Sequence, residues 1–195
     1  MNQNDYSSII VQACESITSN NIDSAASVIR TGYPFSPVEK TERSYTPRTM
    51  TRIFVRDGFI DRYRGTRLVF PPTLRILSHY LPLDFPYHKN GKMTEGHLAY
   101  WELFPTIDHV EPVARGGHDS EDNWVCCSML TNSIKSNWTL EQLQWGLLPP
   151  GNIGEWDGMM RWFLDQIEED NSLLQIPYLK TWWNAAIAAI AEVNC

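Results

Sequence analysis

The feature that most constrains the fold of this chain is a predicted β-hairpin that leads directly into a helix. An aromatic-rich run over residues 98–107 predicts a strand that ends at Asp108-His109. A loop with a Gly-Gly turn separates this strand from a returning strand over residues 123–127, and a helical pattern over residues 129–136 follows at once. The order predicts a hairpin with one helix packed against it.

Four polar side chains stand where this hairpin and helix meet. Asp108 and His109 close the first strand, whereas Asn132 and Lys135 share one helix face because they lie three positions apart. Carboxylate and amide oxygens suit a hard cation such as Mg²⁺ or Mn²⁺, and an imidazole accepts a proton near neutral pH. We expect Asp108 and Asn132 to hold one ion and His109 to act as general base. Lys135 is expected to offer its charge to a phosphate or to the leaving group. This is the chemistry of phosphodiester hydrolysis.

The spacing over residues 104–137 resembles the HNH, or ββα-metal, nuclease motif. His109 matches the first motif histidine, Asn123 the middle asparagine, and Asn132 the final position, where family members carry His or Asn. The spacing also resembles the HNH domain of CRISPR effector nucleases, in which Asp108 matches the metal-binding Asp. The resemblance implies that Asn123 braces the loop and orients the base, and that products carry 5′-phosphate and 3′-hydroxyl ends. The candidate catalytic residues are His109, Asn123 and Lys135, and the candidate ligands of one ion are Asp108 and Asn132.

Residues 56–65 resemble a second family segment, Arg-Asp-x-x-x-Cys-x-x-Cys-Gly, which belongs to a structural zinc site in many HNH enzymes. In this chain Asp61 and Arg64 occupy the two cysteine positions. We therefore expect no structural zinc, and we expect aromatic packing to hold the motif together instead. A second metal bound by His88, His97 and a carboxylate stays an open alternative.

The cysteines also bear on metal binding and on the compartment. They form no C-x-x-C pair, so we expect buried free thiols, and the adjacent pair should point to opposite faces of its strand. The four cysteines are Cys14, Cys126, Cys127 and Cys195. No run of about 18 apolar residues and no signal-peptide pattern occurs, so we expect a cytoplasmic protein with no membrane partner.

Charge is distributed unevenly along a chain whose net charge is −7. Residues 40–75 carry nine basic residues against three acidic ones, whereas residues 139–195 carry eight acidic residues against two basic ones. A polyanion would therefore meet the first region and avoid the second. The planar guanidinium group suits phosphate oxygens. The candidate nucleic-acid contacts are Arg52, Arg56, Arg62, Arg64, Arg67 and Arg115.

The remaining elements and the division of the chain follow from periodicity and turn residues. We expect two helices over residues 5–31, short strands at 52–55 and 67–70, and helices at 73–81, 155–169 and 177–193, with a capping box at Thr139. The expected divisions are an N-terminal helical segment (1–37), an Arg-rich DNA-contacting segment (38–97), the HNH core (98–138) and an acidic helical segment (139–195).

These observations predict an α+β protein with a ββα-metal nuclease core flanked by N-terminal and C-terminal helices. The expected function is metal-dependent cleavage of DNA in restriction or phage defence, with a homodimer formed through the acidic, Trp-bearing helices as a further hypothesis. A nucleic-acid-binding regulator that does not cut, and a structure-selective nuclease or RNase, stay open as alternatives.

Overall fold

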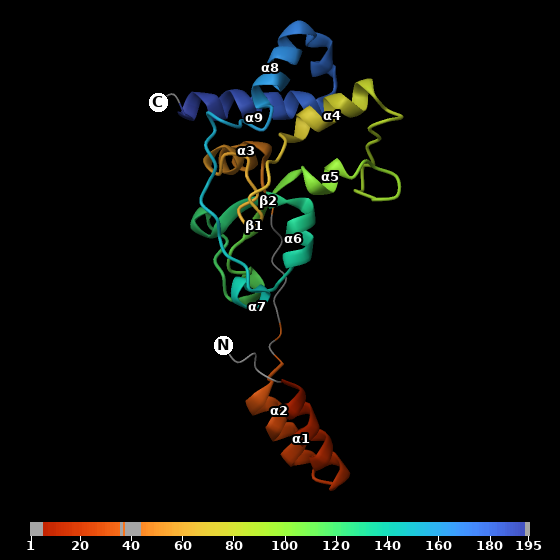
Figure 1. The fold of residues 1–195 in the computed structure, drawn as a ribbon, viewed down its shortest axis with the longest axis vertical. Helices are drawn as coiled ribbons and strands as arrows, with labels where there is room; N and C mark the ends of the chain where they lie inside the picture. The colour runs from red at the N-terminus through yellow and green to blue at the C-terminus, as the bar shows by residue number, and fades with distance from the viewer. Residues whose placement is uncertain (1–5, 36, 38–43, 194–195) are drawn as a thin grey trace. The chain divides into compact units, whose positions relative to one another are not determined.

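The fold is that of a computed structural model, in which residues 6–35, 37 and 44–193 are described. The chain divides into two compact units, residues 1–40 and residues 41–195 (Figure 1). The second unit contains the two boundaries expected near residues 98 and 139, so the segments on either side of them belong to one compact unit. Among the described residues, no helix combines the length and the apolar character needed to cross a bilayer.

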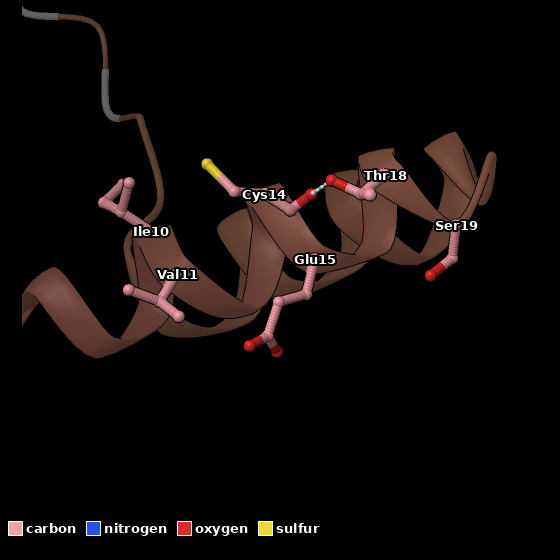
Figure 2. Close-up of a pocket in the computed structure, with 6 residues that line it drawn as sticks. All are labelled: Ile10, Val11, Cys14, Glu15, Thr18 and Ser19. Carbon is pink, nitrogen blue, oxygen red and sulfur yellow. Dashed lines mark hydrogen bonds between the residues drawn. The ribbon is translucent and has the colours of Figure 1, made fainter.

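The first unit is a pair of helices, as the sequence predicts. Helix α1 (Tyr6–Thr18) packs against α2 (Ile22–Gly32), and the Asn21 side chain caps α2 by accepting a hydrogen bond from the Ser24 N–H. Only small side chains, Ala13 and Ala25, are buried among the described residues here. Figure 2 shows a shallow pocket along one side of α1, lined by Ile10, Val11, Cys14, Glu15, Thr18 and Ser19.

The second unit is built around an aromatic core between helices. Helix α3 (Pro47–Arg56) packs against α9 (Pro177–Val193), and α4 (Pro71–Tyr80) packs against both α8 (Met160–Glu169) and α9. A short 3₁₀ helix, η3 (Asn171–Gln175), precedes α9. The largest fully buried side chains in this core include Phe54, Phe59, Phe70, Phe163 and Leu179.

The strand predicted at residues 52–55 is wrong, because this stretch lies within α3. Thr46 caps the helix and Pro47 occupies its first turn, so the chain is already helical when it reaches the apolar run. The strand predicted at 67–70 is also wrong: Arg67 makes only an isolated bridge with Ile60. The expected helix at 155–169 begins later, at Met160, because the Asp157 carboxylate accepts N–H bonds across the preceding turn.

The predicted hairpin and helix are present at the centre of the second unit. Strand β1 (Pro105–His109) pairs antiparallel with β2 (Trp124–Ser128), and His109 lies opposite Trp124. Helix α6 (Met129–Lys135) follows directly, with the Ser128 hydroxyl accepting the Thr131 N–H at its start. Two 3₁₀ turns, η1 (Val113–Arg115) and η2 (Glu121–Asn123), shape the connecting loop. The first strand is shorter than predicted, because residues 99–102 form a helical turn, α5 (Ala99–Glu102).

The remaining sequence predictions concern the C-terminal segment and the cysteines. Thr139 forms the predicted capping box at α7 (Leu140–Leu143). Trp182 is buried in the aromatic core, where its ring lies 5.5 Å from that of Phe70. Cys126 and Cys127 are buried in separate clusters on opposite sides of β2, as alternation predicts. They are free thiols, as is the exposed Cys14; Cys195 lies outside the described residues.

Candidate active site

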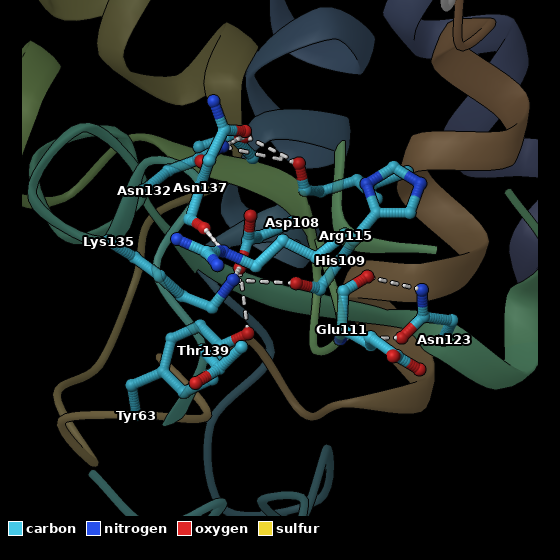
Figure 3. Close-up of polar contacts among 12 residues, drawn as sticks. Tyr63, Asp108, His109, Glu111, Arg115, Asn123, Asn132, Lys135, Asn137 and Thr139 are labelled. Carbon is cyan, nitrogen blue, oxygen red and sulfur yellow. Dashed lines mark hydrogen bonds and ion pairs between the residues drawn. The ribbon is translucent and has the colours of Figure 1, made fainter. Parts of the chain in front are cut away.

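The Asp108 carboxylate is held by two buried partners at the end of β1. Its Oδ2 atom accepts a hydrogen bond from the Tyr63 hydroxyl at 2.7 Å and forms an ion pair with Lys135 Nζ at 2.9 Å. Burial raises the pKa of Tyr63, and the neighbouring Asp108 raises it further, so the phenol stays a donor to the carboxylate. Figure 3 shows these three side chains grouped below the strand end.

Lys135 does not face solvent, contrary to the expectation that it would offer its charge to a phosphate. Its side chain is 0% exposed, and Nζ donates to the His109 backbone oxygen at 2.7 Å as well as pairing with Asp108. A buried ammonium group needs a partner to offset its desolvation, and Asp108 supplies it. The helix face that carries Lys135 therefore points into the protein.

Asn132 fixes α6 against β1 one turn before Lys135. Its Nδ2 atom donates to Thr106 Oγ1 at 2.8 Å and approaches the Ile107 backbone oxygen at 3.3 Å. A backbone oxygen only accepts hydrogen bonds, so the amide nitrogen must face the strand, and the amide oxygen Oδ1 is directed away from it. Ile107 directly precedes Asp108, which brings the amide and the carboxylate to the same part of the strand.

The oxygens available at this site suit a hard divalent cation. Within the described ranges, no hydrogen bond occupies Asp108 Oδ1 or Asn132 Oδ1, whereas the other polar atoms of both side chains are engaged. The described residues contain no group of three His, Cys, Asp or Glu side chains placed to hold a metal. An ion here would therefore take two protein oxygens and complete its shell with water and phosphate, which is how Mg²⁺ commonly binds.

His109 is 4% exposed and lies beside the Asp119 carboxylate and the rings of Tyr45 and Trp124. Its Nε2 atom is 2.8 Å from Asp119 Oδ1, and that oxygen also accepts from Trp124 Nε1 at 2.9 Å and from the Tyr45 hydroxyl at 3.1 Å. Partial burial would raise the pKa of the Asp119 carboxyl, but the hydrogen bonds from His109, Trp124 and Tyr45 outweigh it and hold the pKa below its usual value. Asp119 is thus an ionised acceptor at neutral pH.

Asn123 ties together the two ends of the loop between the strands. Its Oδ1 accepts the Glu111 N–H at 2.8 Å, and its Nδ2 donates to the backbone oxygens of Glu111 and His118, each at 2.8 Å (Figure 3). Gly117 is needed here because a Cβ atom would lie 2.0 Å from the Glu111 oxygen. These contacts are those of a loop brace, the role that the resemblance implies for Asn123.

Two of the six arginines expected to contact nucleic acid form ion pairs with a buried carboxylate within the protein, and the Arg56 side chain is still 40% exposed. Arg56 and Arg62 both form ion pairs with the buried Asp57, at 2.9 and 3.0 Å. Arg56 also donates to the Trp124 backbone oxygen, and Arg62 to that of Leu148. The Arg62 side chain is only 12% exposed, so it has little surface to offer a phosphate.

The other four arginines are exposed. Arg52 forms an ion pair with Glu121 at the surface. Arg64 and Arg67 stack over tryptophan rings, with the Arg64 guanidinium 4.4 Å from the Trp145 ring centre. Arg115 donates to the Asn137 backbone oxygen and lies over Trp138. These guanidinium groups keep donors for an anionic ligand.

The buried Asp61 carboxylate occupies one of the two positions where the segment that residues 56–65 resemble carries cysteine. Asp61 Oδ1 accepts the Tyr63 and Arg64 N–H groups at 3.0 and 3.1 Å, and Oδ2 accepts the Ser128 N–H at 2.9 Å. This joins residues 61–64 to the start of α6. The expectation that aromatic packing holds the motif together is therefore incomplete, because Asp61 supplies a polar link.

Comparison with known proteins assigns the central segment. Residues 93–140 match the family model described as HNH endonuclease. These residues, called the HNH segment below, are similar to the HNH endonucleases. The HNH segment contains both strands and α6, and with them Asp108, His109, Asn123 and Asn132. No curated protein and no solved structure gives a significant match. The similarity suggests a nuclease that acts on nucleic acid, and HNH nucleases generally use divalent metal ions.

Several side chains that contact the polar residues of the HNH segment were not predicted from the sequence. Asp119 lies ten positions beyond His109 in an irregular loop, and Tyr45 lies far upstream, so neither has a periodic relation to the motif. Tyr63 reaches Asp108 from a separate turn. The only sequence signal for Asp61 was its place at a family cysteine position.

Proposed function

We propose that this chain is a metal-dependent endonuclease that hydrolyses DNA phosphodiester bonds and leaves 5′-phosphate and 3′-hydroxyl ends. The observation that supports it best is the placement of Asp108 and His109 at the end of β1, the strand to which Asn132 of α6 is hydrogen-bonded at Thr106 and Ile107, inside the HNH segment. A carboxylate oxygen, an amide oxygen and an imidazole at one strand end are the groups that this hydrolysis needs.

Each residue has a distinct role in this proposal. Asp108 and Asn132 would hold one Mg²⁺ or Mn²⁺, which would supply Lewis-acid stabilisation of phosphate charge. His109 accepts the proton of the attacking water. Lys135 acts through Asp108: with Tyr63 it holds Oδ2, which leaves the other carboxylate oxygen for the ion. Asn123 keeps the loop in place beside His109.

DNA contact falls to the exposed arginines of the second unit. Arg52, Arg64, Arg67 and Arg115 can donate to backbone phosphates, whereas Arg56 and Arg62 act by holding Asp57. The acidic residues 139–195 would repel a polyanion. We propose that the Arg-rich segment binds the DNA backbone and that residues 98–138 carry the groups that hydrolyse the phosphodiester bond.

A substrate panel tests this function. The full chain is incubated with supercoiled plasmid, linear duplex, single-stranded DNA and RNA, each with Mg²⁺, Mn²⁺ or EDTA. We expect Mg²⁺- or Mn²⁺-dependent DNA cleavage, with ends that ligase rejoins without phosphorylation. Binding without cleavage of any substrate would favour a non-cutting regulator, and selective cutting of RNA or branched DNA would favour the alternative nucleases.

The biological setting and the assembly are separate parts of the proposal. A role in restriction or phage defence predicts that expression of the chain lowers phage plating and that a His109→Ala variant does not. A homodimer through the acidic C-terminal helices would bring two sites to a duplex. Light scattering that shows only monomer, with and without DNA, would contradict the dimer.

A further inference from the structure

We infer that Asp119 is a positioning residue for His109, because it holds the imidazole proton on Nε2 and so makes Nδ1 the nitrogen that accepts a proton. The consequence for cleavage rests on the proposed nuclease function. The positioning itself is a property of the unliganded protein and can be measured without any substrate.

The geometry decides which nitrogen carries the proton. Asp119 Oδ1 and His109 Nε2 are 2.8 Å apart, and an ionised carboxylate only accepts hydrogen bonds. If Nε2 carried a lone pair, two acceptors would face each other at this distance. The proton must therefore lie on Nε2, and in the neutral ring Nδ1 then carries the lone pair.

Trp124 is compatible with this assignment, because its N–H lies near the Asp119 carboxylate as well as near the imidazole nitrogen. Trp124 Nε1 is 2.9 Å from Asp119 Oδ1 and 3.1 Å from His109 Nε2. An indole N–H can only donate, and the carboxylate is the stronger acceptor. Both N–H groups therefore point at the same oxygen, and the contact between the indole and imidazole nitrogens is a consequence of that convergence.

The carboxylate is itself placed by the fold. The Tyr45 hydroxyl donates to the same oxygen at 3.1 Å, and the Tyr45 ring meets the Trp124 ring edge-on at 5.0 Å. Asp119 follows His118, whose backbone oxygen is held by Asn123. Asn123 thus acts on His109 at a distance, since it braces the loop that carries Asp119.

The proton position is measured by long-range ¹H–¹⁵N correlation spectra of the full chain, labelled at the histidine ring nitrogens. Spectra are recorded over a series of pH values, and the ring that carries a single proton is the form compared between samples. The His109 signals are those missing from a His109→Ala sample. The variants are Asp119→Ala and Asp119→Asn, and the matched control is Asp122→Ala, an exposed acid of the same loop whose side chain forms no hydrogen bond or ion pair with the described residues.

We expect wild-type His109 to show the Nε2–H form alone. Asp119→Ala should give a mixture of both forms, Asp119→Asn should keep the Nε2–H form because its amide oxygen still accepts, and Asp122→Ala should match the wild type. A wild-type ring with its proton on Nδ1, or an unchanged ring in a folded Asp119→Ala variant, would overturn the inference.

Kinetics tests the consequence for cleavage. Asp119→Ala should lower kcat by about 10- to 100-fold, with KM for DNA changed by less than about threefold, because groups that orient an active-site histidine act on chemistry rather than on binding. If Asp119→Ala raised KM for DNA and left kcat unchanged, the positioning role would be overturned. If the wild type cuts nothing, the nuclease proposal fails, whereas the spectra still decide where Asp119 holds the proton.

Discussion

Lys135 Nζ lies 2.9 Å from Asp108 Oδ2, and both side chains are buried at the junction of α6 and β1. The pair links the helix that carries Asn132 to the strand end that carries His109. Its first role is therefore to fix the site's geometry, and the position of Asp108 depends on a charge that never reaches solvent.

Removing the ammonium group should destabilise the protein strongly. Lys135→Met leaves the Asp108 charge buried without its ion-pair partner, which costs about 3–5 kcal/mol in the free energy of unfolding. Urea denaturation measures the loss, and Lys180→Met, an exposed lysine of α9, is the matched control. A loss below about 1 kcal/mol would show that Asp108 does not need this partner.

The Asp61 link should matter for stability at the start of α6. Asp61→Ala leaves three buried or partly buried N–H groups without their acceptor, and we expect a loss of about 3 kcal/mol or more. Asp61→Asn keeps one acceptor oxygen and should lose less. Asp165→Ala, on the exposed side of α8, should be close to neutral. Equal stability of the Asp61 and Asp165 variants would contradict the link.

The arginines should separate into two groups when DNA affinity is measured by fluorescence anisotropy across salt concentrations. Arg64→Ala and Arg115→Ala should each weaken binding and reduce the salt slope by about 1, because each removes one phosphate contact. Arg62→Ala should mainly lower stability, since it leaves Asp57 without one partner. Arg161→Ala, in the acidic segment, is the control. If the Arg64→Ala and Arg115→Ala variants had the salt slope of the wild type, the DNA would not contact these two arginines.

Asn132 should control the dependence of cleavage on metal. Asn132→Ala removes one of two protein oxygens, so half-maximal cleavage should need about tenfold more Mg²⁺ or Mn²⁺, while DNA affinity measured in EDTA stays the same. Ser133→Ala, an exposed neighbour on α6, should behave as the wild type. The same metal dependence in both variants would exclude Asn132 as a ligand.

Local patterns predicted the centre of the fold because its signals are local. The hairpin, the Ser128 cap and the capping box at Thr139 all depend on residues within a few positions of one another. The prediction of a strand at 52–55 was wrong because a short apolar run fits a strand and a helix equally well. The cap at Thr46 and the proline at position 47 start a helix that includes this run. The first strand was predicted to be too long for a similar reason, since residues 99–102 form a helical turn before β1.

The residues of the candidate site could be proposed from the sequence, but their contacts could not. Asp108, His109, Asn123 and Asn132 could be named from spacing, because the motif fixes their order along the chain. Whether Lys135 points outward or inward depends on how α6 packs on β1, which no local pattern specifies. Asp119 and Tyr63 are brought to the site by tertiary structure alone, so a single sequence held no sign of them.

The most direct test of the central claim compares wild-type protein with His109→Ala on supercoiled plasmid in Mg²⁺, with DNA binding measured in parallel. We predict that the wild type nicks or linearises the plasmid and that EDTA stops it. The variant should bind DNA with unchanged affinity and cut at least about 100-fold more slowly, because it lacks the general base. Cleavage by the variant at the wild-type rate, or no cleavage by the wild type, would contradict the account.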